Sequence, residues 1–329
     1  MFKDLDQPLN RRQFFKAIIE IPALLSAIET SQYIEALGYQ SIEQTITHQY
    51  VPNLSSKLDG LRIINWADMH LGDTKSLLNL YTLPTLIDST NDVLYKTNAN
   101  PEKDILILNG DLSNQATFSS EGDYPETDTN TFKQAIIMIN KIPIKNKFVV
   151  FGNHDNNNSN LSDFKQILED NGFKIIDGRY IDHLDELRII GLPDYTTQKQ
   201  WYNQQYLNNL KHIISSGPPT QIIATHNAEA MDGGGVLPFL RPGTKTFHGH
   251  THGGYIDTGI FTAFLLEQYV RHKLNYHSQF YAGNYRLDNN INVNISTGIS
   301  DYPLNRFPHR PPRSAIRQVT HTKLTTMPC

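Results

Sequence analysis

The sequence is almost devoid of cysteine: Cys329 is the only one among 329 residues. A single cysteine cannot form a disulfide within the chain, so the fold must depend on its hydrophobic core. The lack of paired thiolates also argues against a structural zinc or iron–sulfur site. A cysteine hydrolase is also disfavoured, because the only cysteine is the last residue of the sequence.

Three further absences narrow the function. The sequence has no Gly-x-Ser-x-Gly turn, which disfavours a serine hydrolase. It has no glycine-rich loop followed by Lys-Ser or Lys-Thr, which marks many nucleotide-binding proteins. The formal net charge is −4, so there is no bulk basic excess and we expect no nucleic-acid partner.

A long apolar run is also missing at the N-terminal end. Residues 17–28 are apolar but are interrupted by Glu20 and Pro22, and a transmembrane helix needs about 20 apolar residues. Arg11 and Arg12 precede the run and resemble a twin-arginine export motif. Two interpretations stay open. The segment is either an export leader, or an amphipathic helix that packs on the domain or lies on a membrane surface. A protein that is not exported would meet the cytoplasmic face of the membrane.

A turn-rich segment, residues 53–60, divides the chain. We expect residues 1–58 to form a leader and residues 59–329 to form one catalytic domain. Short apolar runs within the domain predict buried strands at residues 61–67, 104–109, 147–151 and 221–225. Helical patterns lie near residues 75–97, 130–141, 160–171 and 198–215. This alternation predicts an α/β fold with helix-covered sheets, and segments 188–192 and 292–296 add strands to a second, more antiparallel sheet.

Each of the four buried strands ends in residues that can bind a metal, and a later segment adds two histidines. These residues are Asp68 and His70, Asp111, Asn153 followed by His154, His226, and His250 with His252. Ligands of open α/β sheets gather at the carboxyl ends of the strands. Residues two apart on an extended segment point the same way, so each Asp-x-His or His-x-His pair can aim at one pocket.

Taken singly, each motif is more typical of a surface turn or a cap than of a site. Their order, and their position directly after buried strands, carry the prediction of a metal centre. The set combines carboxylate, amide oxygen and imidazole, which suits Mn²⁺, iron or Zn²⁺.

The order Asp-x-His, Gly-Asp, Gly-Asn-His-Asp, His and Gly-His-x-His resembles the calcineurin-like metallophosphoesterases, from residue 61 to about 325. The resemblance implies a four-layer αββα sandwich of two mixed sheets and a pair of divalent metal ions, with manganese expected first. By the same resemblance, one metal is bound by Asp68, His70 and His252. The other is bound by Asn153, His226 and His250, and Asp111 bridges both.

Residues 57–63, 249–254 and 303–307 further resemble the YkuE/YaeI-like branch of that family. The branch includes enzymes that cleave the pyrophosphate of UDP-diacylglucosamine, a precursor in lipid A synthesis. A membrane-associated enzyme with a phosphorylated small-molecule or lipid substrate is the resulting expectation. Two positions depart from the pattern: Asn114 replaces an acid that often orients the catalytic histidine, and Asn227 replaces a glutamate.

His154 is the candidate general acid, because it follows the ligand Asn153 and has no ligand role in the pattern.

Arg306 is either a residue that binds a phosphate group or a surface arginine. With its basic neighbours it could instead contact an anionic membrane. The apolar residues 260–270 form either a lid over acyl chains or ordinary core. The resemblance therefore implies a phosphodiester or pyrophosphate hydrolase. Nucleotide or phosphoprotein hydrolysis, or a noncatalytic scaffold, are the alternatives.

Overall fold

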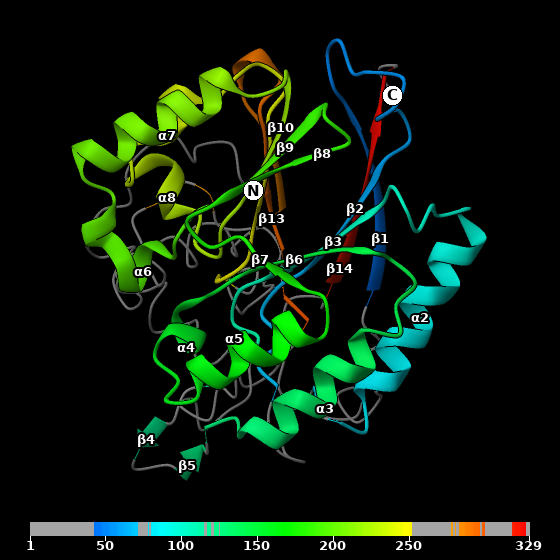
Figure 1. Ribbon diagram of the computed structural model, residues 1–329, viewed down its shortest axis with the longest axis vertical. Coiled ribbons are helices and arrows are strands. Elements are labelled where there is room, and N and C mark those ends of the chain that lie inside the picture. Colours follow the sequence, from blue (N-terminus) through cyan, green and yellow to red (C-terminus); the bar gives the residue numbers. More distant parts are fainter. Residues whose placement is uncertain are drawn as a thin grey trace, which may run out of the picture.

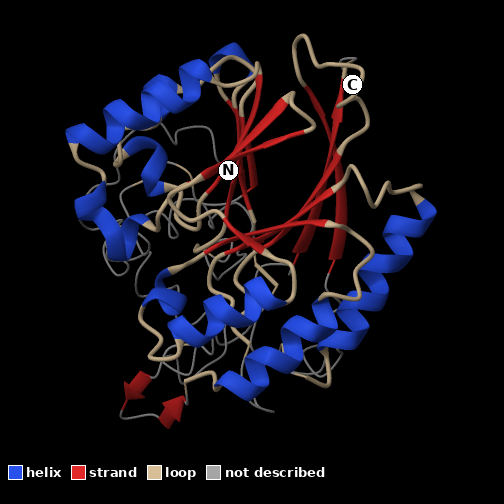
Figure 2. Cartoon of the chain, viewed as in Figure 1, coloured by secondary structure: helices blue, strands red, loops and turns tan. Residues whose placement is uncertain are grey.

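The structure is a computed structural model, and it describes residues 43–71, 78, 80–114, 117–119, 122–124, 126–251, 278, 280, 283–296, 298–299 and 318–326. The leader helix expected before residue 43, the apolar segment 260–270, His252 and Arg306 all lie outside these residues. Two six-stranded sheets pack face to face, and helices cover their outer faces (Figure 1). Figure 2 shows the same arrangement, with the strands of the two large sheets inside and helices outside.

The first sheet carries three of the predicted strands at its centre. Its order is β1-β14-β2-β3-β6-β7, and β2, β3, β6 and β7 run parallel to one another. The strands span β1 Glu43–Tyr50, β14 Gln318–Thr325, β2 Arg62–Trp66, β3 Ile105–Asn109, β6 Asn146–Val150 and β7 Lys174–Ile175. All five residues of β2 and of β3 are buried, as expected of parallel strands that are covered on both faces.

The second sheet contains the fourth predicted strand. Its order is β12-β13-β11-β10-β9-β8, in which β9, β10, β11 and β13 are parallel and the two edge strands are antiparallel. The strands span β12 Gly283–Arg286, β13 Asn292–Ile295, β11 Lys245–His248, β10 Thr220–Ala224, β9 Leu187–Gly191 and β8 Tyr180–His183. The expected antiparallel character is therefore confined to the two edges.

Side-chain alternation along the strands explains the layers. In β3, Ile105 and Ile107 face the second sheet and pack with residues such as Ile222 and Phe247, whereas Leu106 and Leu108 face the helices. The outer face of the first sheet is covered by α2 Leu83–Lys96, α3 Thr129–Ile139 and α5 Leu161–Asp170. The outer face of the second sheet is covered by α7 Gln204–Ser216 and α8 Glu229–Asp232. The predicted four-layer αββα sandwich is confirmed.

Shorter elements complete the described chain. They are the hairpin of β4 Thr117–Ser119 with β5 Gly122–Tyr124, α4 Asn153–Asn156, α6 Tyr195–Gln198, and the 3₁₀ turns η1 Lys199–Trp201, η2 Leu237–Phe239 and η5 Asp288–Asn290. Within the described part of the chain, no helix combines the length and apolarity needed to cross a membrane.

The expected boundary at residue 59 falls after β1. This strand pairs in parallel with β14 from Glu43 to Tyr50, and Val51 and Leu54 pack in the core between the two sheets. Residues 43–58 are thus part of the sandwich. An extended segment before a turn-rich stretch gives no local sign of its partner, because β14 lies at the other end of the sequence.

Candidate metal centre

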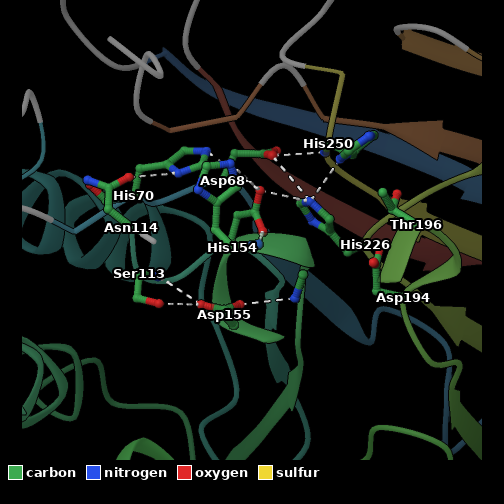
Figure 3. A network of polar contacts seen from close by, with 12 residues as sticks. Asp68, His70, Ser113, Asn114, His154, Asp155, Asp194, Thr196, His226 and His250 are labelled. Atoms are coloured by element: carbon green, nitrogen blue, oxygen red, sulfur yellow. Dashed lines mark hydrogen bonds and ion pairs between the residues drawn. The ribbon is translucent and has the colours of Figure 1, made fainter. Parts of the chain in front are cut away.

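The predicted ligands gather at the carboxyl ends of the central strands of both sheets (Figure 3). Asp68 and His70 follow β2, Asp111 follows β3, and Asn153 opens α4 directly after β6. His226 follows β10, and His250 follows β11. The two sheets thus contribute to one site, which is the convergence expected where parallel strands end.

The backbone at this edge is strained. Asp68, His70, Asp111 and His250 have φ of 52°, 42°, 49° and 72°, in the left-handed region that residues with a Cβ rarely occupy. Such conformations persist only where the surrounding structure enforces them, and they cluster at functional sites. Here they turn the chain after β2, β3 and β11 so that the side chains point at one another (Figure 3).

Two glycines make this convergence sterically feasible. A Cβ at Gly152 would lie 2.1 Å from Asp111 Oδ1, and a Cβ at Gly110 would lie 2.4 Å from His226 Nδ1. Gly110 also has a φ of +77°, which glycine adopts without steric cost. These glycines allow the loops to approach the ligands closely.

Asp111, His226 and His250 form what we term the tight half of the site. Their donor atoms lie within 4.8 Å of one another: His226 Nε2 is 3.1 Å from Asp111 Oδ2 and 3.3 Å from His250 Nδ1. Ligands at about 2.0–2.2 Å from one metal ion are separated from each other by about 3–3.6 Å. The distances from His226 to Asp111 and to His250 therefore already match the spacing that a shared ion requires.

The orientation of the His226 imidazole is fixed by a hydrogen bond on the side away from the other ligands. Its Nδ1 donates to the carbonyl oxygen of Asn109 at 3.2 Å, which leaves Nε2 to face the other ligands. Burial lowers the pKa of His226, but the carboxylates, Asp111 foremost, outweigh burial and raise it to about 10. A metal ion at this position would replace the proton that otherwise neutralises these carboxylates.

His70, Asp111 and His154 form what we term the loose half. Their donor atoms also lie within 4.8 Å of one another, but His70 Nε2 is 3.8 Å and His154 Nε2 is 4.0 Å from Asp111 Oδ2. The two imidazole rings meet edge to face, with centroids 4.7 Å apart. Asp111 is therefore common to both halves, as a bridging ligand would be.

Asp68 and Asn153 complete the oxygen donors. Asp68 is fully buried; its Oδ1 accepts a hydrogen bond from the backbone N–H of His250 at 2.8 Å and lies 3.9 Å from His226 Nε2. Oδ1 of Asn153 is buried and has no hydrogen-bond partner among the described residues. A buried amide oxygen without a donor is costly, and a cation at the site would satisfy it.

The position that departs from the family pattern has a partner. Asn114 Oδ1 lies 3.1 Å from His70 Nδ1, so this amide supports His70, whereas the pattern had led us to seek a partner for His154. His154 is fixed instead through its backbone N–H, which donates to Asp111 Oδ1 at 2.9 Å. Among the described residues, its imidazole is directed by the ring of His70 and the carboxylate of Asp111.

Asp155 is a supporting residue to which the sequence interpretation gave no role. Its carboxylate accepts hydrogen bonds from the backbone N–H groups of Leu112, Ser113 and Gly152 at 2.9–3.2 Å and from the Ser113 hydroxyl at 2.9 Å. Burial, and then the charge of Asp111, raise its pKa to about 6. Asp155 thus ties the loop after β3 to the loop after β6. Its place directly after His154 was the available sequence signal.

The described donors fit divalent metal ions. Four imidazoles, those of His70, His154, His226 and His250, converge on Asp111, and Asn153, which precedes His154, adds an orphaned buried amide oxygen. The structure brings together Asp68, His70, Asp111, Asn153, His154, His226 and His250. His252 and Arg306, the remaining predicted site residues, lie outside the described residues.

Comparison with known proteins identifies the family. The family model for calcineurin-like phosphoesterases matches residues 61–254, more than half of the chain. The uncharacterized metallophosphoesterase YkuE of Bacillus subtilis (strain 168) is 24% identical over 324 residues, covering 92% of this chain and 95% of that protein. The crystal structure of TT1561 of Thermus thermophilus aligns with a TM-score of 0.35 at 9% identity, covering 57% of this chain and 81% of that chain. The chain is a member of the calcineurin-like phosphoesterase family.

Proposed function

We propose that this metallophosphoesterase hydrolyses a phosphodiester or pyrophosphate bond at a centre of two divalent metal ions, with manganese as the preferred metal. The observation that carries the proposal is the position of Asp111, whose carboxylate belongs to both groups of converging donors. In this arrangement His226, His250 and Asn153 would hold one ion, and Asp68 and His70 would hold the other, with His252 assigned to the latter from its motif.

Bound metals of this kind activate water and neutralise charge on the phosphoryl oxygens. The chain's contribution is to hold the ligands before the substrate arrives, because Asp155, Asn109 and Asn114 fix the loops and imidazoles from behind. Such preorganised electrostatics is the principal requirement of phosphoryl transfer.

His154 is the group that we assign to protonate the leaving oxygen. The residue is 9% exposed, and its imidazole lies beside Asp111 in the loose half. A protonated Nε2 is stabilised by that carboxylate and can donate to an ester oxygen. Leaving groups that are poor without protonation, such as alkoxides, should depend on His154 most.

The finer substrate assignment is a lipid-linked pyrophosphate such as UDP-diacylglucosamine. It is supported by the resemblance of residues 57–63, 249–254 and 303–307 to the YkuE/YaeI-like branch. On this assignment Arg306 would bind a phosphate group through its guanidinium, and residues 260–270 would cover an acyl chain at a membrane surface. A soluble nucleotide or a phosphoprotein is the competing substrate.

A substrate panel with added Mn²⁺ tests both the metal-dependent hydrolysis and the finer substrate assignment. It contains an aryl phosphodiester, an aryl phosphomonoester, a nucleoside diphosphate ester, a phosphopeptide and a lipid-linked nucleoside pyrophosphate. Wild type should cleave the aryl phosphodiester, and cleavage should disappear in Asp111→Asn. The lipid-linked substrate should give the highest kcat/KM; a preference for a soluble substrate or the phosphopeptide would overturn the finer assignment.

The noncatalytic alternative makes the opposite prediction. A scaffold would fold and could bind metal, yet it would show no Mn²⁺-dependent turnover on any member of the panel. Absence of turnover in a wild-type protein shown to contain two metals per chain would therefore replace the enzymatic proposal with the scaffold.

A further inference from the structure

The side chain of Asn114 clasps His70 at two points. Its Oδ1 lies 3.1 Å from the imidazole Nδ1, and its Nδ2 donates to the backbone carbonyl of the same histidine at 3.3 Å. The two residues are 44 positions apart in sequence, and both are almost completely buried. Figure 3 shows the contact at the edge of the site, on the side of His70 away from His226.

The second hydrogen bond determines the chemistry of the first. Because a carbonyl oxygen only accepts, the group that faces it must be the amide Nδ2, and the atom that faces the ring must then be Oδ1. An oxygen acceptor requires that Nδ1 of His70 carry the proton. In the neutral imidazole the lone pair is therefore on Nε2, the atom that points toward Asp111 Oδ2.

Asn114 is itself held rigidly. Its backbone N–H donates to the hydroxyl of Thr127 at 2.7 Å, and its carbonyl accepts from the side chain of Asn158 at 2.8 Å. The Thr127 hydroxyl also bonds to the carbonyl of Leu71, the residue after His70. The backbone of Asn114 is thus fixed to Thr127, which precedes α3, through Thr127 to the loop after β2, and to the turn that precedes α5.

We propose that Asn114 is a positioning residue for the loose half: it selects the Nδ1–H tautomer of His70 and holds the ring so that Nε2 is available to a metal ion. The metal part of this inference rests on the proposed function, but the tautomer does not. The same amide supports the strained backbone of His70, whose φ is 42°, because it also binds the carbonyl of that residue.

A measurement of the His70 tautomer tests the positioning role of Asn114 without any metal. In metal-free protein labelled with ¹⁵N-histidine, His70 is assigned by its loss in His70→Gln, at a pH where exposed imidazoles are neutral. Wild type should show the Nδ1–H form. Asn114→Ala should shift His70 toward the Nε2–H form, and Asn114→Asp, which restores an acceptor of the same shape, should recover Nδ1–H. An Nε2–H form in wild type, or an unchanged tautomer in Asn114→Ala, would overturn the proposal.

Metal affinity supplies the second readout. Asn114→Ala should weaken binding of the second Mn²⁺ by about 10–100-fold, the usual effect of removing a partner behind a histidine ligand, and Asn114→Asp should recover most of it. The matched control is Asn146→Ala, because Asn146 also donates to two carbonyls, at 2.8 and 3.2 Å, but lies at the start of β6, away from the site. Equal losses in both alanine variants would reduce Asn114 to a structural role.

The two proposals fail separately. A wild-type protein that binds no Mn²⁺ would contradict the dinuclear centre. The tautomer experiment would still decide whether Asn114 determines the tautomer of His70.

Discussion

The two halves of the site differ in how closely their donors approach. In the tight half, His226 contacts Asp111 at 3.1 Å and His250 at 3.3 Å, whereas in the loose half His70 and His154 stand 3.8 and 4.0 Å from the same carboxylate. The supports differ as well. His226 is oriented by a strand-end backbone carbonyl, whereas His70 is oriented by a side chain from a neighbouring loop.

This difference indicates how the site is organised. A ligand held by main-chain atoms at a strand end is as rigid as the sheet, so the tight half is preorganised for an ion. The loose half has one histidine assigned to the metal and one assigned to the proton transfer, and it has more room between its donors. We therefore expect the tight half to bind metal first and more strongly.

Removing the residue common to both halves should have the largest effect. Asp111→Asn should lose both metals, and activity should fall by more than about 10⁴-fold, because the metals supply most of the rate enhancement. Metal analysis of the purified variant, beside its rate on an aryl phosphodiester, checks this. A variant that retains one metal would show that Asp111 belongs to a single half.

Replacement of His154 separates the two roles available in the loose half. As the general acid, His154→Gln should lower kcat by about 10²–10³-fold on an alkyl leaving group and much less on a nitrophenolate. Its metal content should remain at two per chain. Loss of one metal would instead make His154 a ligand, which its distance from Asp111 does not forbid.

Stepwise Mn²⁺ titration compares the halves directly. His226→Ala should abolish the stronger binding step, a loss of affinity of more than about 100-fold. Even the loss of a residue that only hydrogen-bonds to a ligand lowers metal affinity by about 10–100-fold. His70→Ala should affect the weaker step and leave the stronger one. Isothermal titration of wild type and both variants gives the two constants, and the reverse assignment would contradict the comparison.

The most gradual expected change is the dependence of metal affinity on pH. His226 has a pKa raised to about 10, with burial opposing the shift and Asp111 producing it, so a metal must displace its proton at neutral pH. Affinity of the tight half should therefore rise about tenfold per pH unit until pH 10. Calorimetry in buffers of different ionisation enthalpy should detect about one released proton.

The metal-free protein should show the opposite trend with pH. A folded-state pKa above the unfolded value of 6.5 stabilises the folded protein fully below pH 6.5, and this stabilisation is lost as the pH rises through 10. Thermal unfolding in the presence of a chelator measures it, and His226→Gln is the control that should not show this contribution.

Strands and ligand order were predictable from the sequence because each depends on local pattern. Burial on both faces made β2 and β3 continuous apolar runs, and the ligands follow those runs directly. The first residues of the helices were harder to predict from the sequence. Of the helix predicted over residues 75–97, the structure describes Leu83 to Lys96, with a proline in the first turn, and residues 75–77 and 79 lie outside the described residues. The pattern from residue 198 becomes α7 only after Asn203 caps it.

Supporting contacts were beyond the reach of the sequence because they join distant segments. Asn114 and His70 are 44 residues apart, and Asp155 reaches Ser113 across 42. Both pairs meet only because β2, β3 and β6 lie side by side in the first sheet. Residue identity alone identified Asn114 as unusual, but only the sheet order identifies which histidine it supports.

The central claim is that Asp111 bridges two metal ions. Anomalous diffraction from crystals grown with Mn²⁺ tests it most directly. We predict two anomalous peaks that flank the Asp111 carboxylate, one bonded to His226 and His250 and the other to His70. A single peak, or two peaks of which one does not contact Asp111, would contradict the account.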